Sequence, residues 1–180
     1  MSRTTTNVHI LIVDDHALFR ESIARLLNAE PDFDVVADCS TTRDALRIIS
    51  STRVDLVLLD YDLGQQTGSD FLQKAKLIGF QGKVLIVTAG LSDVEGAQLM
   101  RLGGAGIFMK HSSAATLSEA IRLVMSGGVW FEQQYLRRMF DAPLAEKQDE
   151  RASNQHLKAG SCAHLGRLDE QTNRRPSRCL

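Results

Sequence analysis

The sequence contains little cysteine, which bears on its redox environment. Its 180 residues include three cysteines, Cys39, Cys162 and Cys179. No two of them have the Cys-x-x-Cys spacing of a metal or redox motif, and three are too few for a disulfide scaffold. We therefore expect a reduced, cytoplasmic protein.

Long apolar runs and a strong net charge are also absent. No stretch reaches the roughly 20 consecutive apolar residues that span a bilayer. The first residues are polar and lack the apolar segment and cleavage site of a signal peptide. The net charge is −1, so no basic field draws the whole chain to nucleic acid. We expect no membrane association.

The C-terminal segment lacks most of the residues that build a core. Between residues 141 and 180 there is no isoleucine, valine, methionine or aromatic residue, and the large apolar residues are five leucines. Such a segment buries too little apolar surface to offset the entropy of ordering it. We therefore expect a folded domain over residues 7–127, a linker helix region over 128–145 and a disordered tail over 146–180.

The rest of the sequence alternates short apolar segments with amphipathic ones. Strands are predicted at 8–13, 33–37, 54–59, 83–87 and 107–109. Helices are predicted between them and after the last, where apolar residues recur at i, i+3, i+4 and i+7. Five strand–helix units in strict alternation predict an α/β fold with a five-stranded parallel sheet covered on both faces.

Distinctive polar residues follow four of these strands. Asp14-Asp15 follow the first strand and Asp60 follows the third, while Thr88 and Lys110 follow the fourth and fifth. Because the carboxyl ends of parallel strands meet at one edge of a sheet, these side chains are expected to lie close together.

This set of side chains suits phosphoryl transfer. Three crowded carboxylates need a cation, and hard oxygen ligands favour Mg²⁺. A carboxylate can attack phosphorus and form an aspartyl phosphate. An ammonium group and a hydroxyl can then neutralise charge on the phosphoryl oxygens.

Four segments resemble the signature segments of response-regulator receiver domains: Ile12-Val13-Asp14-Asp15-His16, Leu58-Leu59-Asp60, Val87-Thr88-Ala89 and Met109-Lys110. The resemblance covers residues 7–140. It implies a flavodoxin-like (βα)5 receiver fold with strand order 2-1-3-4-5. It also implies a sensor histidine kinase as partner and a signalling switch rather than a turnover enzyme.

The resemblance implies a role for each polar residue at the sheet edge. Asp60 is the implied phosphoacceptor. The implied Mg²⁺ ligands are Asp14, Asp15, Asp60 and the backbone carbonyl of Asp62. Thr88 is the implied switch hydroxyl, and Lys110 is the lysine that pairs with the phosphoryl group.

Two further segments are similar to the NarL/FixJ group of response regulators, namely Asp14-Asp15-His16-Ala17-Leu18-Phe19-Arg20 and Gly127-Gly128-Val129-Trp130-Phe131. In that group a linker leads to a helix-turn-helix domain that binds DNA. No such domain is visible after residue 140, so we expect no specific DNA binding from this chain as it stands. The group resemblance also suggests a phosphorylation-dependent homodimer, formed through the helix near Asp15 and helix 114–126.

Two positions depart from the receiver pattern. Ile107 stands where the switch aromatic is usual, with Phe108 one residue later. His111 stands where many receivers have proline, so no cis-proline turn is expected. We therefore expect a differently connected switch. His16 is interpreted as a surface or capping residue at a helix start.

Three functions compete. The first is a phosphoacceptor that controls an output, transcription above all. The second is a stand-alone receiver that acts as a phosphate sink or protein-interaction module. The third is a haloacid-dehalogenase-like phosphatase, because Asp60-Tyr61-Asp62 resembles the Asp-x-Asp loop of that family. That loop normally follows the first strand, whereas Asp60 follows the predicted third.

Overall fold

The computed structural model describes residues 7–64 and 66–131. Most of the predicted linker region and the whole predicted tail lie outside the described residues. The elements are β1 (Val8–Val13), α1 (Ala17–Asn28), β2 (Phe33–Cys39), α2 (Thr42–Ser51), β3 (Leu56–Asp60), β4 (Asp62–Leu63), β5 (Gln66–Thr67), α3 (Gly68–Leu77), β6 (Lys83–Thr88), α4 (Asp93–Arg101), β7 (Gly106–Met109), α5 (Ala114–Met125) and β8 (Trp130–Phe131).

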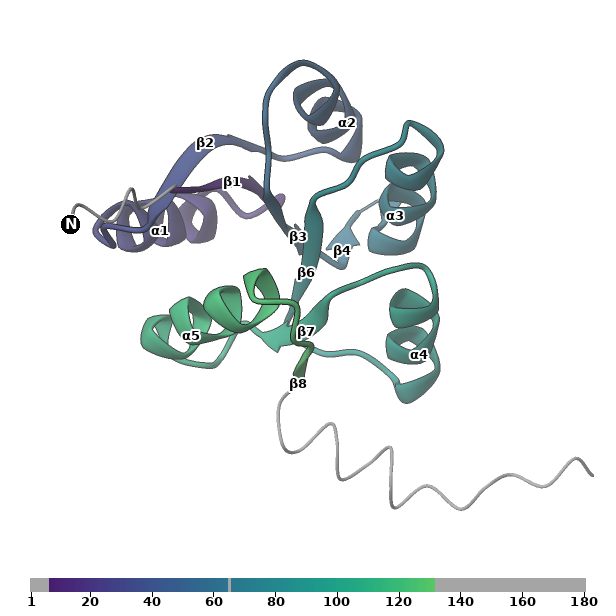
Figure 1. Cartoon of the computed structure of the whole chain (residues 1–180). Helices are drawn as coiled ribbons and strands as arrows, with labels where there is room; N and C mark the ends of the chain where they lie inside the picture. Colours follow the sequence, from purple (N-terminus) through teal and green to yellow (C-terminus); the bar gives the residue numbers. More distant parts are fainter. Residues whose placement is uncertain (1–6, 65, 132–180) are drawn as a thin grey trace, which may run out of the picture. The chain divides into compact units, whose positions relative to one another are not determined.

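The main sheet is parallel throughout and has the order β2-β1-β3-β6-β7-β8 (Figure 1). Its first five strands are the five predicted ones, in the order 2-1-3-4-5. The predicted α/β receiver-type fold is therefore confirmed. Two-residue strands β4 and β5 form a separate antiparallel pair after β3.

The sixth strand of the main sheet, β8, was not predicted, so the described main sheet has one strand more than the five expected, and the short strands β4 and β5 were not predicted either. Two residues are too few to produce a periodic pattern. The close approach of β8 to β7 depends on Gly106, which pairs with Trp130. A Cβ atom at Gly106 would lie 2.6 Å from the main-chain oxygen of Trp130, so a larger residue would push β8 away from β7.

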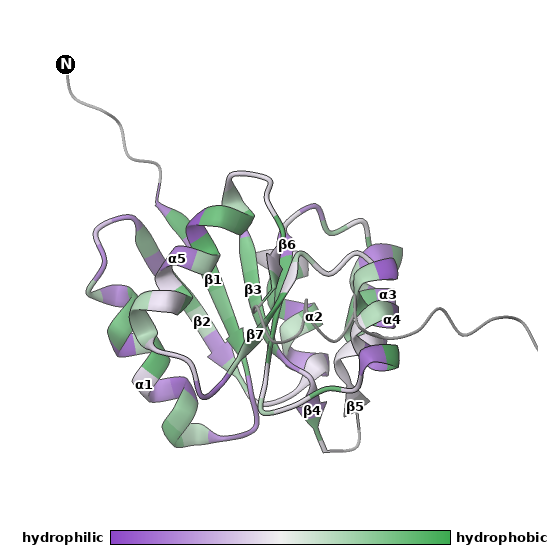
Figure 2. Cartoon of the chain, turned by 90° about the horizontal axis from the view of Figure 1, so that it is seen from below, coloured by the Kyte–Doolittle hydropathy of each residue, from purple (hydrophilic) through white to green (hydrophobic). Residues whose placement is uncertain are grey.

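Successive residues of each central strand pack on opposite faces of the sheet. One face is covered by α2, α3 and α4, and its core includes Leu11, Val57 and Ile86. The other is covered by α1 and α5 (Figure 1), and its core includes Leu58 and Val87. In Figure 2 the central strands β1, β3 and β6 are mostly hydrophobic, whereas the helices on either side mix hydrophobic and hydrophilic residues. Burial on both faces explains why the strand sequences are continuously apolar.

Side chains cap four of the five described helices. Thr41, Thr67, Ser92 and Ser113 each accept a hydrogen bond from a backbone N–H in the first turn of their helix. The remaining helix, α1, begins after His16, whose side chain makes no such bond. The imidazole of His16 is directed to the preceding aspartates instead.

Within the described ranges, no helix is both long and apolar enough to cross a membrane.

Candidate functional site

The carboxyl edge of the sheet brings together the polar residues that the sequence singled out. Asp60 is the last residue of β3 and Thr88 the last of β6, so each lies one residue inside its strand rather than just after it. Asp14 directly follows β1, and Lys110 directly follows β7. Asp14 and Asp60 are 2% and 3% exposed.

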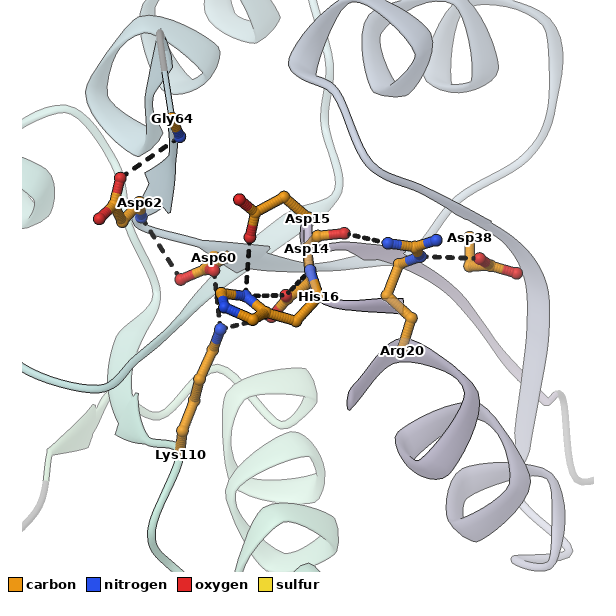
Figure 3. A network of polar contacts seen from close by, with 9 residues as sticks. All are labelled: Asp14, Asp15, His16, Arg20, Asp38, Asp60, Asp62, Gly64 and Lys110. Carbon is orange, nitrogen blue, oxygen red and sulfur yellow. Dashed lines mark hydrogen bonds and ion pairs between the residues drawn. The ribbon is translucent and has the colours of Figure 1, made fainter. Parts of the chain in front are cut away.

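Lys110 lies between the two buried carboxylates (Figure 3). Its Nζ is 2.7 Å from Oδ2 of Asp60 and 2.6 Å from Oδ2 of Asp14. The ammonium group also lies over the ring of Phe19 in α1, 4.8 Å from the ring centroid. A cation on an aromatic face gains electrostatic attraction while it stays shielded from water. Two segments far apart in the sequence therefore hold this one side chain: the β1–α1 segment through Asp14 and Phe19, and the end of β3 through Asp60.

The charges of the pocket shift the pKa values of its members. Burial is the main cause that raises the pKa of Asp60, and the negative charge of Asp14 adds to it. The hydrogen bond from Lys110 opposes this shift without cancelling it. For Lys110, burial disfavours the charged form, but the contacts with the carboxylates of Asp14 and Asp60 and the negative charges of these groups together outweigh burial and raise the pKa. The pocket is thus a negative site with one cation built in.

The same edge offers ligand atoms for a divalent cation. One atom from each of Asp14, Asp15, His16 and Asp60 lies within 4.8 Å of the other three. The Nδ1 atom of His16 is 2.7 Å from Oδ1 of Asp15. Three carboxylates with hard oxygen ligands fit a receiver-type metal site.

Thr88 and Asp62 are at the site but face neighbouring backbone. The Thr88 hydroxyl donates to the carbonyl of Gly90 at 3.0 Å and accepts from its N–H at 3.2 Å. The N–H of Asp62 donates to Oδ1 of Asp60 at 3.4 Å, and the Asp62 carboxylate accepts from the N–H of Gly64 at 3.3 Å (Figure 3). The Asp62 side chain therefore belongs to the turn after β3.

Strand β7 sends its two central residues to opposite faces of the sheet. Ile107 packs in the core beneath α3 and α4 and is 1% exposed. Phe108 packs on the opposite side, against α5. Because neighbours in a strand face opposite ways, Phe108 cannot take the place of an aromatic at position 107.

The sequence reasoning missed three residues near this site. Phe19 lies in α1, and its ring contacts Lys110. Arg20 binds the main chain of Asp14, and Tyr61 contacts Glu95 in α4. Phe19 and Arg20 belong to the segment that resembles the NarL/FixJ group, and this resemblance is the sequence feature that could have marked them as site residues. Nothing in the sequence marked Tyr61.

Comparison with known proteins agrees with this geometry. The chain is 31% identical over 142 residues to the nitrate/nitrite response regulator protein NarP of Escherichia coli, covering 76% of this chain and 66% of that protein. It is 30% identical over 127 residues to the transcriptional regulatory protein DegU of Brevibacillus brevis, covering 68% of this chain and 52% of that protein. The chain therefore spans about half to two thirds of the length of these relatives.

A solved structure supports the same assignment. The two-component response regulator of the LuxR family from Aurantimonas superposes with a TM-score of 0.70 at 25% identity, covering 74% of this chain and 96% of that one. The family model of the response regulator receiver domain matches residues 10–122. With the acidic pocket and its lysine at the carboxyl edge of the sheet, this match shows that the chain belongs to the receiver domain family, whose members are signalling switches rather than turnover enzymes.

Proposed function

We propose that Asp60 accepts a phosphoryl group from a sensor histidine kinase and that the receiver domain spans residues 7–127. The observation that carries the proposal is the position of the Asp60 carboxylate, which is buried at the end of β3, 2.7 Å from the Lys110 ammonium. A nucleophile held beside a cation is already oriented for attack on an anionic group.

The transfer forms one bond and breaks one. A carboxylate oxygen of Asp60 attacks phosphorus in line with the bond to the donor. The phosphorus–nitrogen bond of the kinase phosphohistidine breaks, and its electron pair leaves with the imidazole. Negative charge spreads over the three equatorial phosphoryl oxygens. Lys110 then pairs with one of these oxygens in place of its present contact with Oδ2 of Asp60.

The fit of the pocket to a divalent cation supports Mg²⁺ as the cofactor. The carboxylates of Asp14, Asp15 and Asp60 would hold it, with the backbone carbonyl of Asp62 as a further ligand. Bound Mg²⁺ would supply positive charge to the phosphoryl oxygens. The buried Asp14 carboxylate needs such a partner once Lys110 turns toward the phosphoryl group.

Thr88 would report the transfer to the surface. Its hydroxyl is a donor already, and a phosphoryl oxygen is a stronger acceptor than the carbonyl of Gly90. Rotation of this hydroxyl toward Asp60 would break both hydrogen bonds with Gly90. The loop between β6 and α4 would then move, which is the change that an output could read.

The output we propose is control of transcription, in the cytoplasm. The transcriptional role rests on the relatives, one of which is named a transcriptional regulatory protein and another a nitrate/nitrite response regulator. The chain matches 52% and 66% of the lengths of these two relatives. Each relative therefore contains a further part that this chain does not match.

Phosphorylation with acetyl phosphate and Mg²⁺ tests the proposal. We expect one phosphoryl group per chain on Asp60, through a bond that is stable to acid and labile to base. Asp60→Asn removes the label, whereas the control Asp62→Asn keeps it because only the backbone of Asp62 is used. Undiminished labelling of Asp60→Asn would refute the assignment. Continuous phosphate release with many turnovers would favour a hydrolase instead.

A further inference from the structure

The guanidinium of Arg20 connects the acidic pocket to strand β2. Arg20 lies in the first turns of α1, and its side chain reaches back over the turn that follows β1 (Figure 3). Its Nη1 donates to the main-chain oxygen of Asp14 at 2.6 Å. Its Nε pairs with Oδ1 of Asp38 near the end of β2 at 3.1 Å. The Arg20 side chain is 17% exposed and its contact with the Asp14 carbonyl is partly buried, whereas Asp38 is 51% exposed and its ion pair with Arg20 faces solvent.

The carbonyl that Arg20 binds belongs to the peptide group that joins Asp14 to Asp15. The orientation of this peptide decides where the two carboxylates point. The N–H of Asp14 is itself bound to the carbonyl of Cys39 in β2 at 3.1 Å. Both main-chain polar groups of Asp14 are therefore connected to β2. Its N–H binds Cys39 directly, and its carbonyl is linked to Asp38 through Arg20.

We propose that Arg20 is a positioning residue of the phosphorylation site: it fixes the Asp14–Asp15 peptide so that both carboxylates face the centre they share with Asp60. This inference rests on the proposed function, since it concerns the affinity of the pocket for Mg²⁺. Arg20 touches none of the reacting atoms. It acts through the main chain, as groups outside the ligand shell orient the ligands of other metal sites.

The planar fork of arginine suits this role. One nitrogen donates to a carbonyl while another meets a carboxylate, and the two directions are fixed relative to each other. A lysine at position 20 would keep the charge but could not hold both partners in this geometry. Asp38 in turn orients the guanidinium.

An ordinary ion pair would behave differently. Exposed ion pairs contribute little to stability, and a pair that does not contact the pocket is expected to leave Mg²⁺ binding unchanged. Arg47 and Asp44 provide such a pair on α2, with an Nη1 to Oδ1 distance of 3.4 Å and an Arg47 side chain that is 79% exposed. Arg47→Ala is therefore the matched control for Arg20→Ala.

Calorimetric titration of the full chain with Mg²⁺ alone tests the inference, at a temperature where circular dichroism shows every variant folded. We expect Arg20→Ala to bind Mg²⁺ about 10–100-fold more weakly than the parent, which is the range seen when second-layer partners of metal ligands are removed. Arg20→Lys should stay close to Arg20→Ala, and Asp38→Asn should lose several-fold. Arg47→Ala should bind as the parent does.

The possible outcomes separate this inference from the proposed function. If the parent binds Mg²⁺ and Arg20→Ala binds it equally well, the positioning role is wrong while the metal site stands. If Arg20→Lys restores full affinity, charge alone matters and the fork geometry does not. If the parent fails to bind Mg²⁺, the metal part of the proposed function fails first and the inference falls with it.

Discussion

The phenol of Tyr61 donates a hydrogen bond to Oε1 of Glu95 at 2.8 Å. Tyr61 is the residue directly after Asp60, and Glu95 lies in the first turn of α4. The other carboxylate oxygen, Oε2, accepts from the N–H of Ser92 at 2.9 Å and from its hydroxyl at 2.6 Å. One carboxylate thus joins the loop after the phosphoacceptor to the N-terminus of α4, above a core that contains Ile107 in place of an aromatic.

Removal of this link should loosen α4. Tyr61→Phe keeps the ring and deletes one hydrogen bond, so we expect a loss of about 1 kcal/mol in the free energy of unfolding. Hydrogen exchange over residues 92–101 should become faster in the unphosphorylated variant. A double-mutant cycle with Glu95→Gln should show that the effects of the two substitutions are not additive. Purely additive effects would show that the two side chains are energetically independent.

The same pair should make stability depend on alkaline pH. Burial and the hydrogen bond to Glu95 raise the pKa of Tyr61 to about 12, above the value of about 10 for an unfolded tyrosine. A pKa raised by folding gives stability that is fully present below pH 10 and is lost as the pH rises toward 12. Urea unfolding should therefore show a steeper loss for the parent than for Tyr61→Phe in this window. Parallel pH profiles would contradict the prediction.

Asp60→Asn should stabilise the protein when no metal is added. The pKa of Asp60 is raised by folding, so its ionised form at neutral pH is disfavoured in the folded state. Asparagine removes that charge, and Lys110 keeps its ion pair with Asp14. We expect a rise of a few degrees in Tm by calorimetry. The control Asp34→Asn, at an exposed position in β2, should leave Tm unchanged. A Tm of Asp60→Asn that is equal to or lower than that of the parent would count against the prediction.

Ile107 is expected to serve packing rather than signal transmission. It is 1% exposed in the core beneath α4, so Ile107→Val should cost about 0.5–1.5 kcal/mol of stability. Labelling of Asp60 should be unaffected. The change in hydrogen exchange over residues 88–111 on phosphorylation should also match that of the parent. A variant that is phosphorylated normally but shows no such change would make Ile107 part of the switch.

The predicted phosphorylation-dependent homodimer can be tested through α1. Leu18 is 82% exposed on this helix, and Leu77 is 85% exposed at the end of α3. If α1 forms the interface, Leu18→Ser should weaken association about tenfold, as expected for the loss of one buried leucine. Leu77→Ser is the matched control and should have no effect. Sedimentation with and without acetyl phosphate and Mg²⁺ measures both, and equal effects of the two substitutions would exclude an interface specific to α1.

The pattern of the chain predicted most of the fold and which polar residues lie at the carboxyl edge of the sheet. Continuous apolar strands between amphipathic helices occur where a sheet is covered on both faces, so the strand positions could be read directly. The same logic assigned Asp14, Asp60, Thr88 and Lys110 to one edge, because parallel strands end on the same side. The two-residue strand β8 left no such periodic signal.

The sequence by itself therefore determined where each strand ends along the chain and which residue types lie at those ends. Only the tertiary structure decided which side chains meet: Lys110 between Asp14 and Asp60, Arg20 on the carbonyl of Asp14, and Tyr61 on Glu95. The physical reason is that periodicity reports which face or edge a residue occupies. A hydrogen bond between residues 34 or 50 positions apart depends instead on how helices pack on the sheet and on the side-chain rotamers that this packing leaves open.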